Sequence, residues 1–82
     1  MRNMDAFNLS KEDFVRLVGY LKSNYKNVRK NPNDLPEYGV GRVSVIASAY
    51  YGQALIVGDE EDREKTRYSL EEQAKVEFVE IL

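Results

Sequence analysis

The sequence predicts a small α+β domain in which one amphipathic helix packs on an antiparallel sheet. Two segments carry this prediction. Apolar residues recur at three- and four-residue spacing over residues 11–25, as in a helix with one buried face. Residues 43–57 contain no charged side chain, although charged residues make up 32% of the chain. This second segment is rich in the β-branched residues that strands favour, so we expect it to supply the centre of the sheet.

The composition of the chain limits both its size and its chemistry. At 82 residues it is expected to form one domain, and a hydrophobic fraction of 43% is enough for a core. The chain has no cysteine and no histidine. This removes disulfides, thiolate nucleophiles, the commonest transition-metal ligand and the usual general base near neutral pH. We therefore expect a protein that is not an enzyme and that uses no cofactor or metal.

The first predicted element is a helix from Lys11 to Tyr25, preceded by residues 1–9, which we expect to be flexible. Ser10 is a favoured N-cap residue, and acids in the first turn with lysines in the last suit the helix dipole. Gly19 costs up to about 1 kcal/mol relative to alanine inside a helix, so we expect a close packing contact there. The apolar stripe consists of Phe14, Leu17, Val18, Leu21 and Tyr25.

Residues 26–41 are predicted to form a structured connector rather than a linker between two domains. Asn31, Pro32, Asn33 and Asp34 are residue types typical of turns, and Pro36 disfavours helix at the residue before it. Because 82 residues leave room for one domain, residues 1–82 are expected to be a single domain.

The uncharged run, residues 43–57, is compatible with two structures. As a β-hairpin that turns at Gly52 and Gln53, it places mainly valine and alanine on one side and serine and tyrosine on the other. As a helix it also presents an apolar face, because apolar residues recur at heptad-like spacing. We favour the hairpin. The alternative is an all-α assembly of three helices, with a long central helix over about residues 41–66.

The last part of the chain is predicted to contain a polar loop, a helical turn and a strand. Residues 58–68 are polar throughout and read as a loop, and Ser69 with Glu72 has the spacing of a capping box. Residues 75–82 are rich in strand formers. The sheet would then combine residues 42–57 with residues 75–82. A small barrel that resembles the SH3 architecture, preceded by a helix, is one version of this fold.

No segment carries a recognisable catalytic or metal-binding motif. The carboxylates that follow the uncharged run lack the alternate-residue spacing and the central glycine of a calcium-binding loop, so we expect a solvated acidic loop there. These residues are Asp59, Glu60, Glu61, Asp62 and Glu64. Gly39 and Gly41 form a lone GxG pair, which is far short of a dinucleotide-binding fingerprint.

Charge is distributed unevenly along the chain. Residues 1–42 have a net charge of +3 and residues 43–82 a net charge of −5. A basic segment with interleaved tyrosines, in which lysine and arginine would neutralise phosphates, predicts nucleic-acid binding as an alternative function. Its residues are Lys22, Lys26, Arg29 and Lys30. The isoelectric point of about 5.1 argues against this alternative, because nucleic-acid-binding domains are usually basic.

Six tyrosines against three phenylalanines suggest a surface that meets a partner. Tyrosine and arginine dominate interface hot spots, and the predicted partner-binding residues are Tyr38, Arg42, Tyr50 and Tyr51. We therefore expect a non-enzymatic regulatory protein that acts by occupying a macromolecular partner, for example as an inhibitor. A homo-oligomer that sequesters a small ligand is a further alternative.

The sequence predicts neither a membrane-spanning segment nor a secretory signal. The uncharged run of 15 residues is shorter than the roughly 20 apolar residues that span a bilayer. The first residues also lack the apolar region of a signal peptide, so the expected compartment is the cytoplasm.

Overall fold

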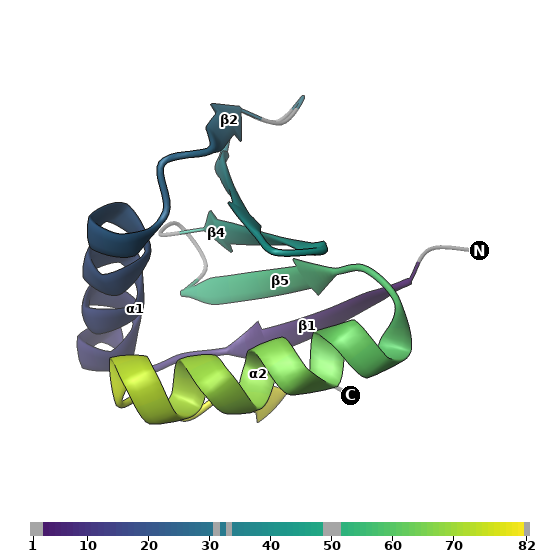
Figure 1. Ribbon diagram of the computed structural model, residues 1–82. Helices are drawn as coiled ribbons and strands as arrows, with labels where there is room; N and C mark the ends of the chain where they lie inside the picture. Colours follow the sequence, from purple (N-terminus) through teal and green to yellow (C-terminus); the bar gives the residue numbers. More distant parts are fainter. Residues whose placement is uncertain (1–2, 31, 33, 49–51, 82) are drawn as a thin grey trace.

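The computed structural model describes residues 3–30, 32, 34–48 and 52–81. In this part of the chain two helices and a six-stranded antiparallel sheet form an α+β fold (Figure 1). The elements are β1 (Met4–Asn8), α1 (Lys11–Asn24), β2 (Val28–Lys30), β3 (Pro36–Val40), β4 (Val43–Ser48), β5 (Gln53–Val57), α2 (Glu60–Ala74) and β6 (Val79–Glu80).

The strands lie in the order β2-β3-β4-β5-β1-β6, and each pair of neighbours is antiparallel. Strands β2 to β5 follow one another as a meander, whereas β1 lies between β5 and β6. The predicted hairpin is confirmed, with Val45 opposite Ile56 and Ala47 opposite Ala54. The all-α alternative is wrong. The sheet is open rather than a closed SH3-like barrel, because β2 and β6 lie at opposite edges of the described sheet.

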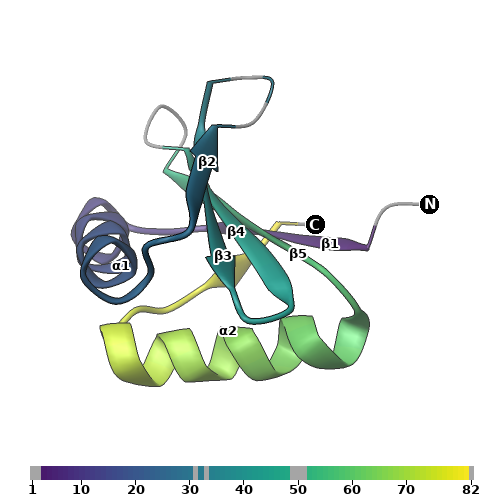
Figure 2. The ribbon, with the colours of Figure 1, turned by 45° about the horizontal axis from the view of Figure 1, so that its top comes forward.

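The register gives the sheet two different faces. Phe7, Tyr38, Val45, Ala54 and Ile56 are on one side and join residues of both helices in the core. We call this side the helix face. Figures 1 and 2 show both helices on it, with α1 across one end of the strands and α2 along their length. The opposite side, which carries alternate residues such as Ala6, Ile46 and Leu55, is the open face.

Helix α1 forms nearly as predicted. The Ser10 side chain caps it by accepting a hydrogen bond from the Asp13 backbone N–H, 3.1 Å away. Leu17 and Leu21 are fully buried from its apolar stripe. The prediction for Gly19 is wrong, because a Cβ atom added there would meet no atom of the described residues within 4 Å apart from its own helix backbone and chain neighbours. Gly19 is therefore an exposed helix glycine with no packing role.

Two predicted boundaries are wrong. Residues 58–68 are expected to be a polar loop, but residues 60–68 form the first part of α2. This helix buries Leu70 and Ala74 along a narrow stripe, and its exposed side carries ion pairs at four-residue spacing such as Lys65 with Glu61. Such a helix has weak apolar periodicity, so its polar composition resembles that of a loop. Residues 4–8 of the segment expected to be flexible form β1, which pairs with both β5 and β6.

The predicted connector, residues 26–41, is structured where it is described, and contains β2 and β3. In the described part of the chain, neither helix has the length and apolar character needed to cross a membrane.

Candidate functional site

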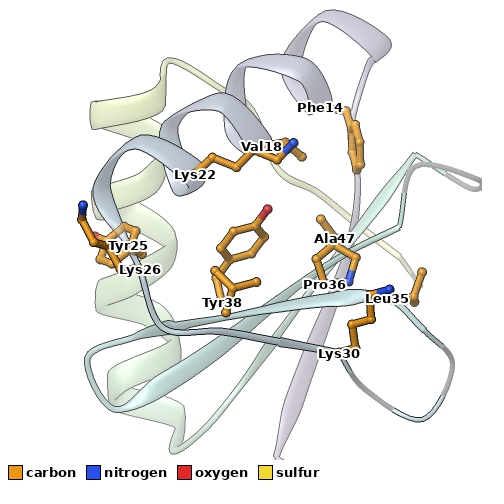
Figure 3. A pocket seen from close by; sticks show the side chains of 11 residues that line it. Phe14, Val18, Lys22, Tyr25, Lys26, Lys30, Leu35, Pro36, Tyr38 and Ala47 are labelled. Atoms are coloured by element: carbon orange, nitrogen blue, oxygen red, sulfur yellow. The ribbon is translucent and has the colours of Figure 1, made fainter.

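A groove of about 720 Å³ lies between α1 and the β2–β3 hairpin, on the helix face of the sheet (Figure 3). It exists because the short strand β2 extends the sheet beyond the area that α1 covers. Most of its lining consists of hydrocarbon and aromatic side chains. The lining residues are Phe14, Val18, Lys22, Tyr25, Lys26, Val28, Lys30, Leu35, Pro36, Tyr38 and Ala47.

Tyr38 and Ala47 form the floor of the groove. Both are almost completely buried, with 1% and 2% of their surface exposed. The Tyr38 ring stands up from β3 toward α1, and its hydroxyl lies below Val18 and Lys22 (Figure 3). This hydroxyl has no hydrogen-bond partner among the residues that the structure describes. Every buried polar side-chain atom in this part of the chain does have a partner, so the Tyr38 hydroxyl is not buried. It is therefore accessible from the groove and available to a ligand.

The walls of the groove are aliphatic and aromatic. Phe14 and Val18 come from α1, and Leu35 and Pro36 come from the start of β3. Val28, on the edge strand β2, lines the groove and is 46% exposed. These side chains give the groove an apolar surface that water covers only at a free-energy cost, so it favours an apolar occupant.

Three lysines surround the groove. Lys22 lies in the last turn of α1, Lys26 follows the end of this helix, and Lys30 lies on β2. Lys30 pairs with Asp34, with Nζ 3.3 Å from Oδ1. Within the described residues, Lys22 and Lys26 have no carboxylate partner within 4.0 Å. The rim of an apolar groove therefore carries unneutralised positive charge.

Tyr25 closes the groove near the end of α1. Its ring contacts that of Tyr20 edge-to-face, with centroids 6.1 Å apart. Burial, and in second place the neighbouring Tyr20 hydroxyl, raise the pKa of Tyr25 above 10.0. The phenol is therefore neutral at physiological pH and lines the groove as an uncharged group.

The predicted partner-binding residues do not form one surface. Tyr38 lines the groove, whereas Arg42 lies exposed in the turn between β3 and β4 and lines a separate depression with Lys65 and Thr66. Tyr50 and Tyr51 lie outside the described residues. The prediction that these four residues bind a partner together remains a prediction.

The predicted basic set is brought together in part. Lys22, Lys26 and Lys30 share the groove. Arg29 does not line it, because strand alternation turns its side chain to the opposite side, where Nη2 lies 3.6 Å from Glu37 Oε2.

Sequence reasoning missed the apolar half of the site. The sequence pattern predicts Phe14 and Val18 as part of an apolar helix stripe that faces the core. It predicts Ala47 as one of the alternating residues of a strand. A usable signal was Val28, an apolar residue inside a polar and basic segment. The carboxylates expected as an acidic loop lie in and beside the first turn of α2, and no group of three or more potential metal ligands occurs among the described residues.

Comparisons with protein-family models, with curated proteins and with solved structures find no match for this chain. The site must therefore be interpreted from its own chemistry.

Proposed function

We propose that this is a non-enzymatic binding protein that accepts a segment of a protein partner in the groove between α1 and the β2–β3 hairpin. The observation that carries the proposal is the combination of an apolar floor, an unpartnered Tyr38 hydroxyl that is accessible from the groove, and a lysine rim in one groove. Binding such a segment would occupy part of the partner and so regulate it.

The chemistry of the groove specifies the occupant. An apolar side chain that enters between Val18 and Pro36 would be removed from water, which contributes about 1.5–3 kcal/mol for a leucine- or phenylalanine-sized group. A polar atom beside it would accept a hydrogen bond from Tyr38. Carboxylates on the flanking residues would meet Lys22 and Lys26, which steer association more than they add affinity. The expected partner segment is therefore a bulky apolar residue next to aspartate or glutamate.

Nucleic acid fits the groove less well. Single strands bind where aromatic rings stack on bases and cations follow the backbone. Here much of the wall is aliphatic, and Arg29 faces away from the lysines. The chain as a whole has a net charge of −2. Nucleic-acid binding is thus the competing outcome of the test.

A small amphipathic carboxylate is a second candidate ligand. The groove volume, about 720 Å³, lies within the range of sites that bury small molecules. Native mass spectrometry of the purified protein distinguishes this case, because a sequestered ligand would add a defined mass that denaturation removes.

The proposal is tested by a selection from a random peptide display library on the immobilised full chain. We expect recovered peptides that combine a bulky apolar residue with acidic neighbours. Their binding should weaken in a Lys22→Glu, Lys26→Glu double variant, in which both substituted side chains are exposed. Lys11→Glu, at the other end of α1, is the matched control and should bind normally. Peptides without this pattern, or peptides that bind the double variant equally well, would refute the proposal. Preferential binding of oligo-dT, falling steeply with salt, would favour nucleic acid instead.

A further inference from the structure

The open face of the sheet carries no charge over four neighbouring strands. From β4, β5, β1 and β6 it presents only aliphatic, thioether, hydroxyl and amide side chains, as the register shows. The charged residues within these four strands, Asp5 and Glu80, both point to the helix face, where they line a pocket with Arg63 of α2. This is the reverse of the usual pattern, in which the water-facing side of an antiparallel sheet is the polar one.

The apolar residues of this face form a continuous row across the strands. Ile46 lies opposite Leu55 and Leu55 lies opposite Ala6, while the Ile81 backbone N–H donates to the Ala6 carbonyl, 3.1 Å away. Ile46 is 6% exposed although it is outside the core cluster, and Ile81 is 37% exposed. Val79, one row away, is 51% exposed. The row thus continues to an exposed apolar edge.

Polar residues flank this row on one side. Ser48, Gln53 and Asn8 lie opposite one another on β4, β5 and β1. Hydroxyl and amide groups both donate and accept hydrogen bonds. In a second copy of the chain, the row could therefore bond either to the same row or to Ser44, which lies on the other side of the apolar row. The nearest charges on this face, Arg29 and Glu37, pair with each other at its β2–β3 end.

We infer that the open face is the interface of a homodimer, in which two copies pack sheet on sheet about a two-fold axis near Leu55 and Ala6. A two-fold axis places each patch against itself, which would oppose like charges on a charged face. The part of this face formed by β4, β5, β1 and β6 has none to oppose. Sheets pack about 10 Å apart with their inner side chains interdigitated, and a largely aliphatic central row is suited to that geometry.

The same chemistry disfavours other occupants. A nucleic acid or an anionic membrane would require cations, and among the described residues of this face the cation is Arg29, which is paired with Glu37. Because both helices lie on the opposite face, the dimer would leave its two grooves facing outward and free. It would then present two copies of the groove to a partner, which raises the strength of binding to a partner with repeated segments. The dimer does not depend on what the groove binds.

Sedimentation velocity of the full chain, from about 1 μM to about 1 mM, tests the inference. We expect a concentration-dependent shift from the mass of one chain to the mass of two. Leu55→Glu should raise the dissociation constant about 100-fold or more, because it buries like charges at the axis. Val79→Glu, at a half-exposed position where folding is not at risk, should weaken the dimer less. Val15→Glu, on the exposed side of α1, is the matched control and should dimerise normally.

A charge-exchange experiment distinguishes this interface from any other. Leu55→Glu and Leu55→Lys should each be monomeric alone, and a mixture of the two should recover the dimer. A wild-type chain that stays monomeric at all concentrations would overturn the inference. So would a dimer that Leu55→Glu and Val79→Glu leave unchanged, or a mixture that does not associate.

Discussion

The Asp13 side chain of α1 accepts a hydrogen bond from the Glu77 backbone N–H, with 2.9 Å between Oδ2 and N. Its other carboxylate oxygen pairs with Arg16, whose Nε donates to the Lys75 carbonyl at 3.1 Å. Two residues of the first helix thus fix the chain where it leaves α2. This arrangement holds α1 in position over one end of the sheet, where it forms one wall of the groove.

Asp13→Ala should therefore destabilise the protein. A hydrogen bond to a charged group contributes about 1.5–3 kcal/mol, and the Asp13 side chain is largely shielded, with 15% of it exposed. We expect the free energy of unfolding to fall by about 1–2 kcal/mol, measured by urea denaturation. Glu12→Ala, in the same helical turn but exposed, is the matched control and should cost less. Equal losses in both variants would mean that Asp13 acts only through the helix dipole.

Gly19→Ala should stabilise the protein. The residue lies in the interior of α1, and beyond its own helix backbone an added Cβ atom would meet no described residue within 4 Å. Alanine is favoured over glycine in a helix by about 0.5–1 kcal/mol. Thermal unfolding should therefore show a higher midpoint. A lower midpoint would indicate a contact on this side of α1 that the structure does not contain.

Gly58→Ala should have the opposite effect. Here a Cβ atom would lie 2.8 Å from Cγ1 of Val43, a buried residue of β4, and 3.4 Å from the Arg42 carbonyl oxygen. Relief requires movement of the packed link between β5 and α2, so we expect a loss of about 1–3 kcal/mol in urea denaturation. A neutral substitution would show that this link yields easily.

The raised pKa of Tyr25 predicts that the folded protein loses stability at high pH. Its pKa is raised above 10.0 in the folded protein, chiefly by burial. The folded state thus favours the neutral phenol, and this contribution is complete at pH values below 10 and lost as the pH rises through the folded pKa. The urea midpoint of the wild type should fall more steeply above pH 10 than that of Tyr25→Phe. Near neutral pH the two proteins should respond to pH in parallel, and parallel curves throughout would contradict the prediction.

Strong local signals in the sequence predicted the parts of the fold that depend on them. The Ser10 cap and the apolar stripe of α1, and the strand formers on both sides of Gly52, each lead to the observed element. Strand β1 was missed because its five residues gain their stability from β5 and β6, which are distant in sequence. Helix α2 was missed because it buries few residues, so its periodicity is faint.

The candidate site was predictable only on its charged side. Lys22, Lys26 and Lys30 stand out in the sequence because they lie within nine consecutive residues. Their apolar counterparts come from α1, β3 and β4, and it is the packing of α1 against the sheet that brings them together. Tyr38 is one of the predicted partner-binding residues, and the structure places it almost completely buried in the floor of the groove, with its hydroxyl toward α1.

The most direct test of the groove is a calorimetric titration of one recovered acidic and apolar peptide into three proteins. Val28 and Val15 are both exposed valines, at 46% and 63%, but only Val28 lines the groove. The wild type and Val15→Asp should bind the peptide equally, whereas Val28→Asp should weaken binding by about tenfold or more, since it places a carboxylate beside the apolar anchor and the acidic flanks. Equal binding by all three proteins would contradict the assignment of this groove as the binding site.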